Sequence, residues 1–120
     1  MPNANRDAGH RFERDVAEKM RQCGFVDCVT SRAESKSLDD AGIDLVHTGP
    51  LAVQCKRTNN QPRFADLLKR MEESCKAHRL AGNVPVVYHK TKGKPATVTM
   101  TASDFEELAA MLVKEGIWKP

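Results

Sequence analysis

A three-residue turn between two apolar segments is the feature that most constrains the fold. Residues 43–47 and 51–56 both have the composition of buried β-strands, and Thr48-Gly49-Pro50 between them has the composition of a turn. Because parallel strands need a much longer crossover, so short a connection predicts that the two segments pair as an antiparallel hairpin. The rest of the chain has to fold around that pair.

Helical periodicity stands out on either side of these strands. Phe12, Val16 and Met20 recur at spacings of four, which predicts a helix over residues 8–22 with Asp7 as its N-cap. The other expected elements are strands over residues 25–31, 84–88 and 96–100, a polar loop over residues 32–42, a helix over residues 63–80, and a last helix after a capping box at Ser103 and Glu106.

The resulting order is helix, three strands, helix, two strands, helix. With 120 residues, of which 40% are hydrophobic, the chain fits one domain spanning residues 1–120. Strands followed by helices that can cover both faces predict the α/β class, with a mixed sheet flanked by helices.

The sequence also bears on the cellular compartment. No apolar run approaches the roughly 20 residues of a membrane span, and the first residues lack the apolar stretch of a signal peptide. Four scattered cysteines without a CxxC pair favour reduced thiols over a zinc site or a disulfide framework. We therefore expect a cytoplasmic protein without a membrane partner.

Three polar residues on the two hairpin strands indicate a functional site. Gln54 and Lys56 are two positions apart on a strand, so their side chains project from the same face. Asp44 on the neighbouring strand can lie opposite or diagonal to them. A carboxylate, an amide and an ammonium are costly to bury unless they pair or bind a metal.

Phosphodiester hydrolysis is the chemistry that these groups suit. Asp44, the amide oxygen of Gln54 and the backbone carbonyl of Cys55 could hold a hard divalent cation, with Glu13 completing the site from the first helix. Such oxygen ligands favour Mg²⁺ or Mn²⁺ over zinc. Lys56 would orient the attacking water or stabilise the charge that develops on the phosphate.

Four segments together resemble a known family. Residues 9–14, 23–25, 42–46 and 53–56 (GHRFER, CGF, GIDLV and VQCK) are similar to the archaeal-type Holliday junction resolvases of the PD-(D/E)xK nuclease superfamily. The resemblance covers the first half of the chain by motif and the second half only by its order of elements. It implies a restriction-endonuclease-like α-β-β-β-α-β core and a metal-dependent endonuclease for DNA recombination and repair.

The resemblance also assigns roles to individual residues. It implies that Glu13 is the helix acid, Asp44 the metal-binding aspartate and Lys56 the catalytic lysine. Gln54 departs from the family pattern, which usually has a second acid there, although QxK variants occur in related nucleases such as the VRR-NUC branch. Arg14 and the loop at Ser31 and Arg32 would approach the DNA backbone, and the active form would be a symmetric homodimer.

The net charge of +3 permits a nucleic-acid partner without requiring one. The candidates for a basic rim that would contact DNA phosphates are Arg32, Lys36, Arg57, Arg63, Lys69 and Arg70, and the same residues are equally compatible with an ordinary charged surface. The lysines of residues 90–94 likewise fit either of two roles, contact with the DNA backbone or a charged turn in solvent.

Two other functions remain compatible with the sequence. The first is a DNA-binding module that kept the fold while its catalytic site decayed, which the neutral Gln54 favours. The second is an unrelated α/β interaction protein in which the motif is accidental. Neither the preferred DNA structure (junction, flap, duplex end or single strand) nor the oligomeric state follows from the sequence, because one fold serves many functions.

Overall fold

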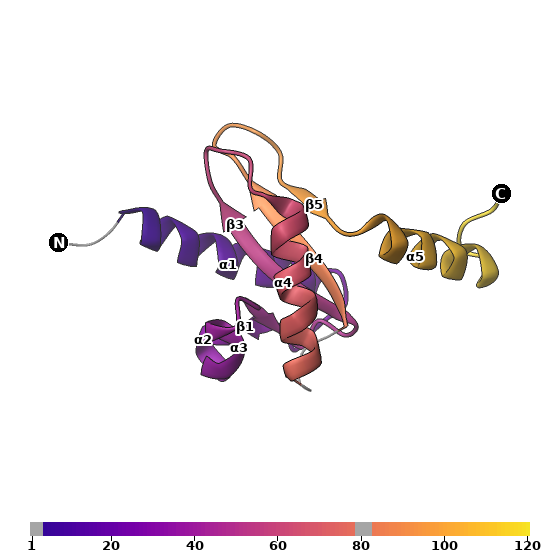
Figure 1. The fold of residues 1–120 in the computed structure, drawn as a ribbon, viewed down its shortest axis with the longest axis horizontal. Helices are drawn as coiled ribbons and strands as arrows, with labels where there is room; N and C mark the ends of the chain where they lie inside the picture. Colours follow the sequence, from indigo (N-terminus) through magenta and orange to yellow (C-terminus); the bar gives the residue numbers. More distant parts are fainter. Residues whose placement is uncertain (1–3, 79–82) are drawn as a thin grey trace.

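A three-stranded mixed sheet lies at the centre of the structure, a computed structural model that describes residues 4–78 and 83–120 (Figure 1). The helices are α1 (Ala4–Gln22), α2 (Ser31–Glu34), α3 (Lys36–Asp40), α4 (Phe64–Ala77) and α5 (Ala102–Lys114). The strands are β1 (Val29–Thr30), β2 (Leu45–Val46), β3 (Leu51–Arg57), β4 (Val84–Lys90) and β5 (Thr97–Thr99). Apart from the short α2 and α3, this is the predicted order of elements.

The central sheet has the strand order β3-β4-β5. β3 and β4 are parallel, with Gln54 beside Val87 and Lys56 beside His89, while β5 pairs antiparallel with β4. A parallel pair needs a long crossover, and α4 provides it. The chain is therefore of the α/β class, as the sequence predicts.

The helices α1 and α4 cover opposite faces of the sheet. On one face, Leu67 and Met71 of α4 pack with Ala52 and Val87 of the strands. On the other face, the α1 stripe of Phe12, Val16 and Ala17 packs with Val53 and Val86. Because successive strand residues point to opposite faces, Gln54 and Lys56 share the α4 face with Ala52, and Cys55 shares the α1 face with Val53.

The prediction that the strands on either side of residues 48–50 pair as an antiparallel hairpin is wrong. β2 pairs antiparallel with β1 instead, and β3 pairs with β4. A backbone hydrogen bond of 2.8 Å from Asp44 N–H to the Val53 carbonyl still joins the two segments. His47 (φ 62°) and Gly49 (φ 58°) both adopt the left-handed conformation, so the chain leaves the extended conformation before a ladder can form.

The predicted polar loop over residues 32–42 contains the two short helices α2 and α3. Ser35 lies between them, and its side chain caps α3 by accepting a hydrogen bond from Leu38 N–H. Leu38 is only 2% exposed and packs into the core on the α4 face. One capping serine and one buried leucine are enough to order a segment whose composition otherwise indicates a loop.

Three expected boundaries also change. The strand predicted over residues 25–31 is reduced to β1, and α1 begins at Ala4, which places Asp7 inside its first turn rather than at the cap. The cap of α5 is Thr101, whose hydroxyl accepts from Asp104 N–H at 3.1 Å, so the capping box at Ser103 is wrong by two residues. The predicted helix end at Leu80 lies outside the described residues.

The last helix, α5, extends away from the sheet at the end opposite to the N-terminus of α1 (Figure 1). None of its residues is buried, and its apolar side chains are largely exposed, including Phe105 (50%) and Met111 (58%). Trp118, which follows this helix, is 47% exposed. Among the described residues, no helix combines the length and apolarity that crossing a membrane requires.

Candidate active site

Asp44 is held in place by three hydrogen bonds, two of them to the edge of β3. Its N–H donates to the Val53 carbonyl at 2.8 Å, and its carboxylate Oδ2 accepts from the Cys55 N–H at 2.7 Å. Its carbonyl accepts from the Ser31 N–H at 2.7 Å. The sequence prediction that Asp44 lies beside the Gln54–Lys56 segment is therefore confirmed, although side-chain bonding replaces the regular ladder.

Gln54 and Lys56 face a cavity of about 230 Å³ between β3, α4 and the loop that follows α3. Arg70 of α4 and Gly42 also line it. The predicted common face of the two β3 residues is thus confirmed. Arg70, which the sequence offered only as one of several rim cations, lies at the same cavity as Lys56.

The Gln54 side chain has an unusual environment for an amide. Its Oε1 is buried and has no hydrogen-bond partner among the described residues. On the other side, a Cβ added to Gly42 would lie 3.2 Å from Gln54 Nε2, and Gly42 has φ 81°. An unpaired buried acceptor costs about 1–3 kcal/mol, so this oxygen would gain from any donor or cation that reached it.

Glu13 comes from α1 and pairs with Arg32 of α2. Arg32 Nε donates to Glu13 Oε2 at 3.1 Å, with the two side chains 14% (Glu13) and 31% (Arg32) exposed. Because the neighbouring Ser31 N–H bonds to the Asp44 carbonyl, this ion pair lies close to Asp44. The expected approach of the helix acid to the site is consistent with this geometry, and the pairing with Arg32 was not foreseen.

Burial raises the pKa of Asp44 from 3.8 to about 7. The Cys55 N–H and Lys56 act in the opposite direction, while the nearby carboxylates of Glu13 and Asp39 raise the pKa further. The pKa of the Cys55 thiol is raised first by burial and then by Asp44 and Glu13. Negative charge at this position is therefore unfavourable unless a positive charge joins it.

The predicted metal ligands fit a divalent cation in part. No group of three or more His, Cys, Asp and Glu side chains is placed to hold a metal within residues 4–78 and 83–120. A cation at this position would therefore depend on Asp44 and on neutral oxygens. The unpaired Gln54 Oε1 is one such oxygen. The Cys55 carbonyl is another, since it points to the same strand edge as the Cys55 N–H that bonds Asp44.

The residues predicted to contact DNA have different environments. Ser31 is fully buried, so its side chain cannot touch DNA and that prediction is wrong. Arg32 bonds Glu13 through its Nε, and its side chain is 31% exposed. The remaining predicted contacts are exposed, namely Arg14, Lys36, Arg57 and Arg63. The four cysteines are free thiols.

Comparison with known proteins identifies no relative: no family model matches the chain, and neither a curated protein nor a solved structure matches it significantly.

The pKa of Asp44 predicts an unusual dependence of stability on pH. Between pH 3.8 and about 7, the native state keeps a proton on Asp44 that the unfolded state has lost, so raising the pH favours unfolding. The loss of stability caused by ionising Asp44 in the folded protein is absent below pH 3.8 and complete above pH 7. Asp44→Asn, which can still accept from Cys55, should be more stable than wild type at pH 8 by on the order of 2–4 kcal/mol.

Urea unfolding of both proteins in EDTA from pH 4 to pH 9 tests this. The stability difference should grow with pH and level off above pH 7, and exposed Asp27→Asn serves as the matched control. A difference that does not change with pH would show that Asp44 titrates normally.

Proposed function

We propose that the chain is a metal-dependent DNA endonuclease that selects DNA by its structure, in the manner of the Holliday junction resolvases that its motifs resemble. The observation that carries this proposal is the juxtaposition at β3 of the partly buried Asp44 carboxylate, the unpaired Gln54 oxygen and the Lys56 ammonium. An acid, a free neutral oxygen and a cation side by side are the groups that phosphodiester hydrolysis requires.

Each residue then has a defined task. Asp44 and Gln54, with the Cys55 carbonyl, would hold Mg²⁺ or Mn²⁺, which when bound supplies positive charge at the scissile phosphate. Lys56 orients the attacking water or stabilises the charge on the phosphate, and Arg70 adds positive charge at the same cavity. Glu13, held by Arg32, completes the acidic side of the site.

A cleavage assay tests the proposal. Labelled four-way junction, flap, duplex and single-stranded DNA are incubated with Mg²⁺ or Mn²⁺, or with EDTA. Wild type should cut at least one substrate only with metal. Asp44→Ala and Lys56→Ala should each lose about 100-fold or more of the rate while still binding DNA, and exposed Lys119→Ala should cut normally.

The alternative function is a non-catalytic DNA-binding module on the same fold. The lack of a three-acid metal cluster among the described residues favours it, as does the neutral Gln54. If wild type binds DNA but cuts none of the four substrates with either metal, the endonuclease proposal fails and this alternative stands.

The role of Gln54 can be tested by restoring the acid. Gln54→Glu adds one negative charge beside Asp44, and it should tighten Mn²⁺ binding about tenfold or more in isothermal titration calorimetry. Gln22→Glu, at an exposed position at the end of α1, makes the same chemical change away from the site and should have no effect. An affinity for Mn²⁺ that is unchanged or lower in Gln54→Glu would mean that Gln54 is not a ligand.

We further propose that the active form is a homodimer joined through α5. This helix exposes apolar side chains over its whole length, including Phe105, Leu108 and Met111. Its acids lie in the first half and Lys114 in its last turn, so an antiparallel pair of α5 helices brings opposite charges together. Two such faces could bury on the order of 1,000 Å², which a specific interface needs.

The oligomeric state in solution decides between this interface and a monomer. Wild type should sediment with twice the 13.3 kDa mass of the chain. Leu108→Glu should sediment as a monomer, because it places a charge in the apolar face. Ala110→Glu introduces the same side chain on the opposite side of α5 and should remain dimeric. A monomeric wild type would contradict the dimer.

A further inference from the structure

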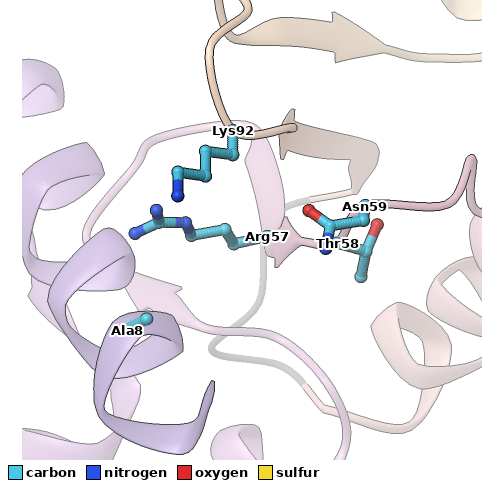
Figure 2. A pocket seen from close by; sticks show the side chains of 5 residues that line it. All are labelled: Ala8, Arg57, Thr58, Asn59 and Lys92. Atoms are coloured by element: carbon cyan, nitrogen blue, oxygen red, sulfur yellow. The ribbon is translucent and has the colours of Figure 1, made fainter. Parts of the chain in front are cut away.

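A second cavity, of about 460 Å³, lies where β3 ends, next to the first half of α1 (Figure 2). It is lined by Ala8, Arg57, Thr58, Asn59 and Lys92. The lining contains two cations, an amide and no acid. It is separate from the cavity of Gln54 and Lys56, because Arg57 follows Lys56 on the strand and projects to the opposite face of the sheet.

The two cations of this cavity converge. Figure 2 shows the Arg57 guanidinium and the Lys92 ammonium extending toward one another from β3 and from the turn after β4. Neither side chain has a hydrogen bond or an ion pair with any other part of the chain that the structure describes. Two like charges aimed at the same space repel one another, and an anion between them would remove that repulsion.

Hydrogen bonds fix the two segments that carry these cations. Thr58 N–H donates to the Lys90 carbonyl at 3.2 Å, and the Thr91 hydroxyl donates to the Thr58 carbonyl at 3.1 Å. The Thr58 hydroxyl donates to the Asn60 carbonyl at 2.6 Å and lies 3.0 Å from His89 Nε2. The frame of the cavity is therefore set before any ligand arrives, which lowers the entropy cost of binding.

The lysines around this turn have different roles. The Lys90 ammonium donates to the carbonyl oxygens of Thr91 and Lys94, so it closes the turn and is not available to a ligand. Lys92 extends into the cavity instead. Of the lysines in residues 90–94, Lys92 is the one that lines this cavity.

The helix α1 contributes one wall of the cavity. Ala8, in its second turn, is the α1 residue that lines it. The positive potential comes from Arg57 and Lys92, and two converging cations have the character of a phosphate site.

We propose that this cavity binds one backbone phosphate of the DNA substrate, shared by Arg57 and Lys92. This inference rests on the proposed endonuclease function. Glu13 follows Ala8 by five residues on α1, about 7.5 Å along a helix, so the cavity adjoins the acid that α1 contributes to the proposed site.

The test is DNA binding measured by fluorescence anisotropy in EDTA, over a range of KCl concentrations, for wild type, Arg57→Ala, Lys92→Ala and the double variant. Each single variant should bind about 5- to 10-fold more weakly, and the double variant should lower the slope of log K against log [KCl] by about 0.9, the loss of one phosphate contact. The double variant should lose less than the sum of the two, because both cations hold the same phosphate.

The controls separate the failure of this subsite from the failure of the endonuclease function. Lys119→Ala removes one exposed charge outside the cavity. If wild type binds and cuts DNA while Lys92→Ala behaves as Lys119→Ala does, the subsite is refuted and the endonuclease proposal stands. Fully additive losses in the double variant would also refute a shared phosphate.

Inorganic phosphate tests the anion site without DNA. In a titration followed by amide NMR, Ala8, Asn59 and Lys92 should shift in wild type and not in the double variant. If wild type binds no DNA, the endonuclease proposal and the DNA subsite both fail, and this titration alone decides whether the cavity binds anions. An absence of shifts in wild type would show that it does not.

Discussion

The hydrogen bond between the Asp44 carboxylate and the Cys55 N–H is the interaction on which the site depends. It takes the place of a ladder bond along the free edge of β3, so a catalytic candidate is fixed by the backbone of the sheet itself. The Asp44 N–H and carbonyl are bonded as well, to Val53 of β3 and to Ser31 at the start of α2. Asp44 itself lies just before β2, so these bonds fix a residue that is not part of a strand.

The same residue is where the fold is least favourable electrostatically. Burial raises the pKa of Asp44 more than the bond from Cys55 lowers it, and Glu13 and Asp39 add to the rise. Arg32 offsets part of this negative charge, because its guanidinium pairs with the Glu13 carboxylate at 3.1 Å. Asp44 has no comparable partner among the described residues, apart from the weaker influence of Lys56. The remaining imbalance is what a divalent cation would correct, and it supports a binding role for Asp44 independently of any family resemblance.

Periodicity in the sequence predicts the parts of the structure that packing controls. The stripe of α1 and the two-residue spacing of Gln54 and Lys56 lead directly to the observed faces, because one side of each element has to be buried. The pairing of strands and the ends of helices depend on single residues, which a periodic pattern does not reveal. The left-handed His47 breaks the expected hairpin, and the Ser35 cap with buried Leu38 turns an expected loop into helices. Contacts between distant segments, such as Arg32 with Glu13, leave no local pattern in the sequence at all.

In the proposed site, an amide at position 54 is compatible with the balance of charge around Asp44. A glutamate at this position would place a further carboxylate beside Asp44, whose pKa is already raised to about 7 by burial and by two other acids. Without a cation, that arrangement would favour either protonation or a loosening of the β3 edge. An amide supplies the same oxygen without the charge, and the buried, unpaired Oε1 of Gln54 keeps that oxygen available. The consequence is weaker attraction for a cation and a more stable protein in its absence, so affinity for metal and stability without metal are opposed at this one residue.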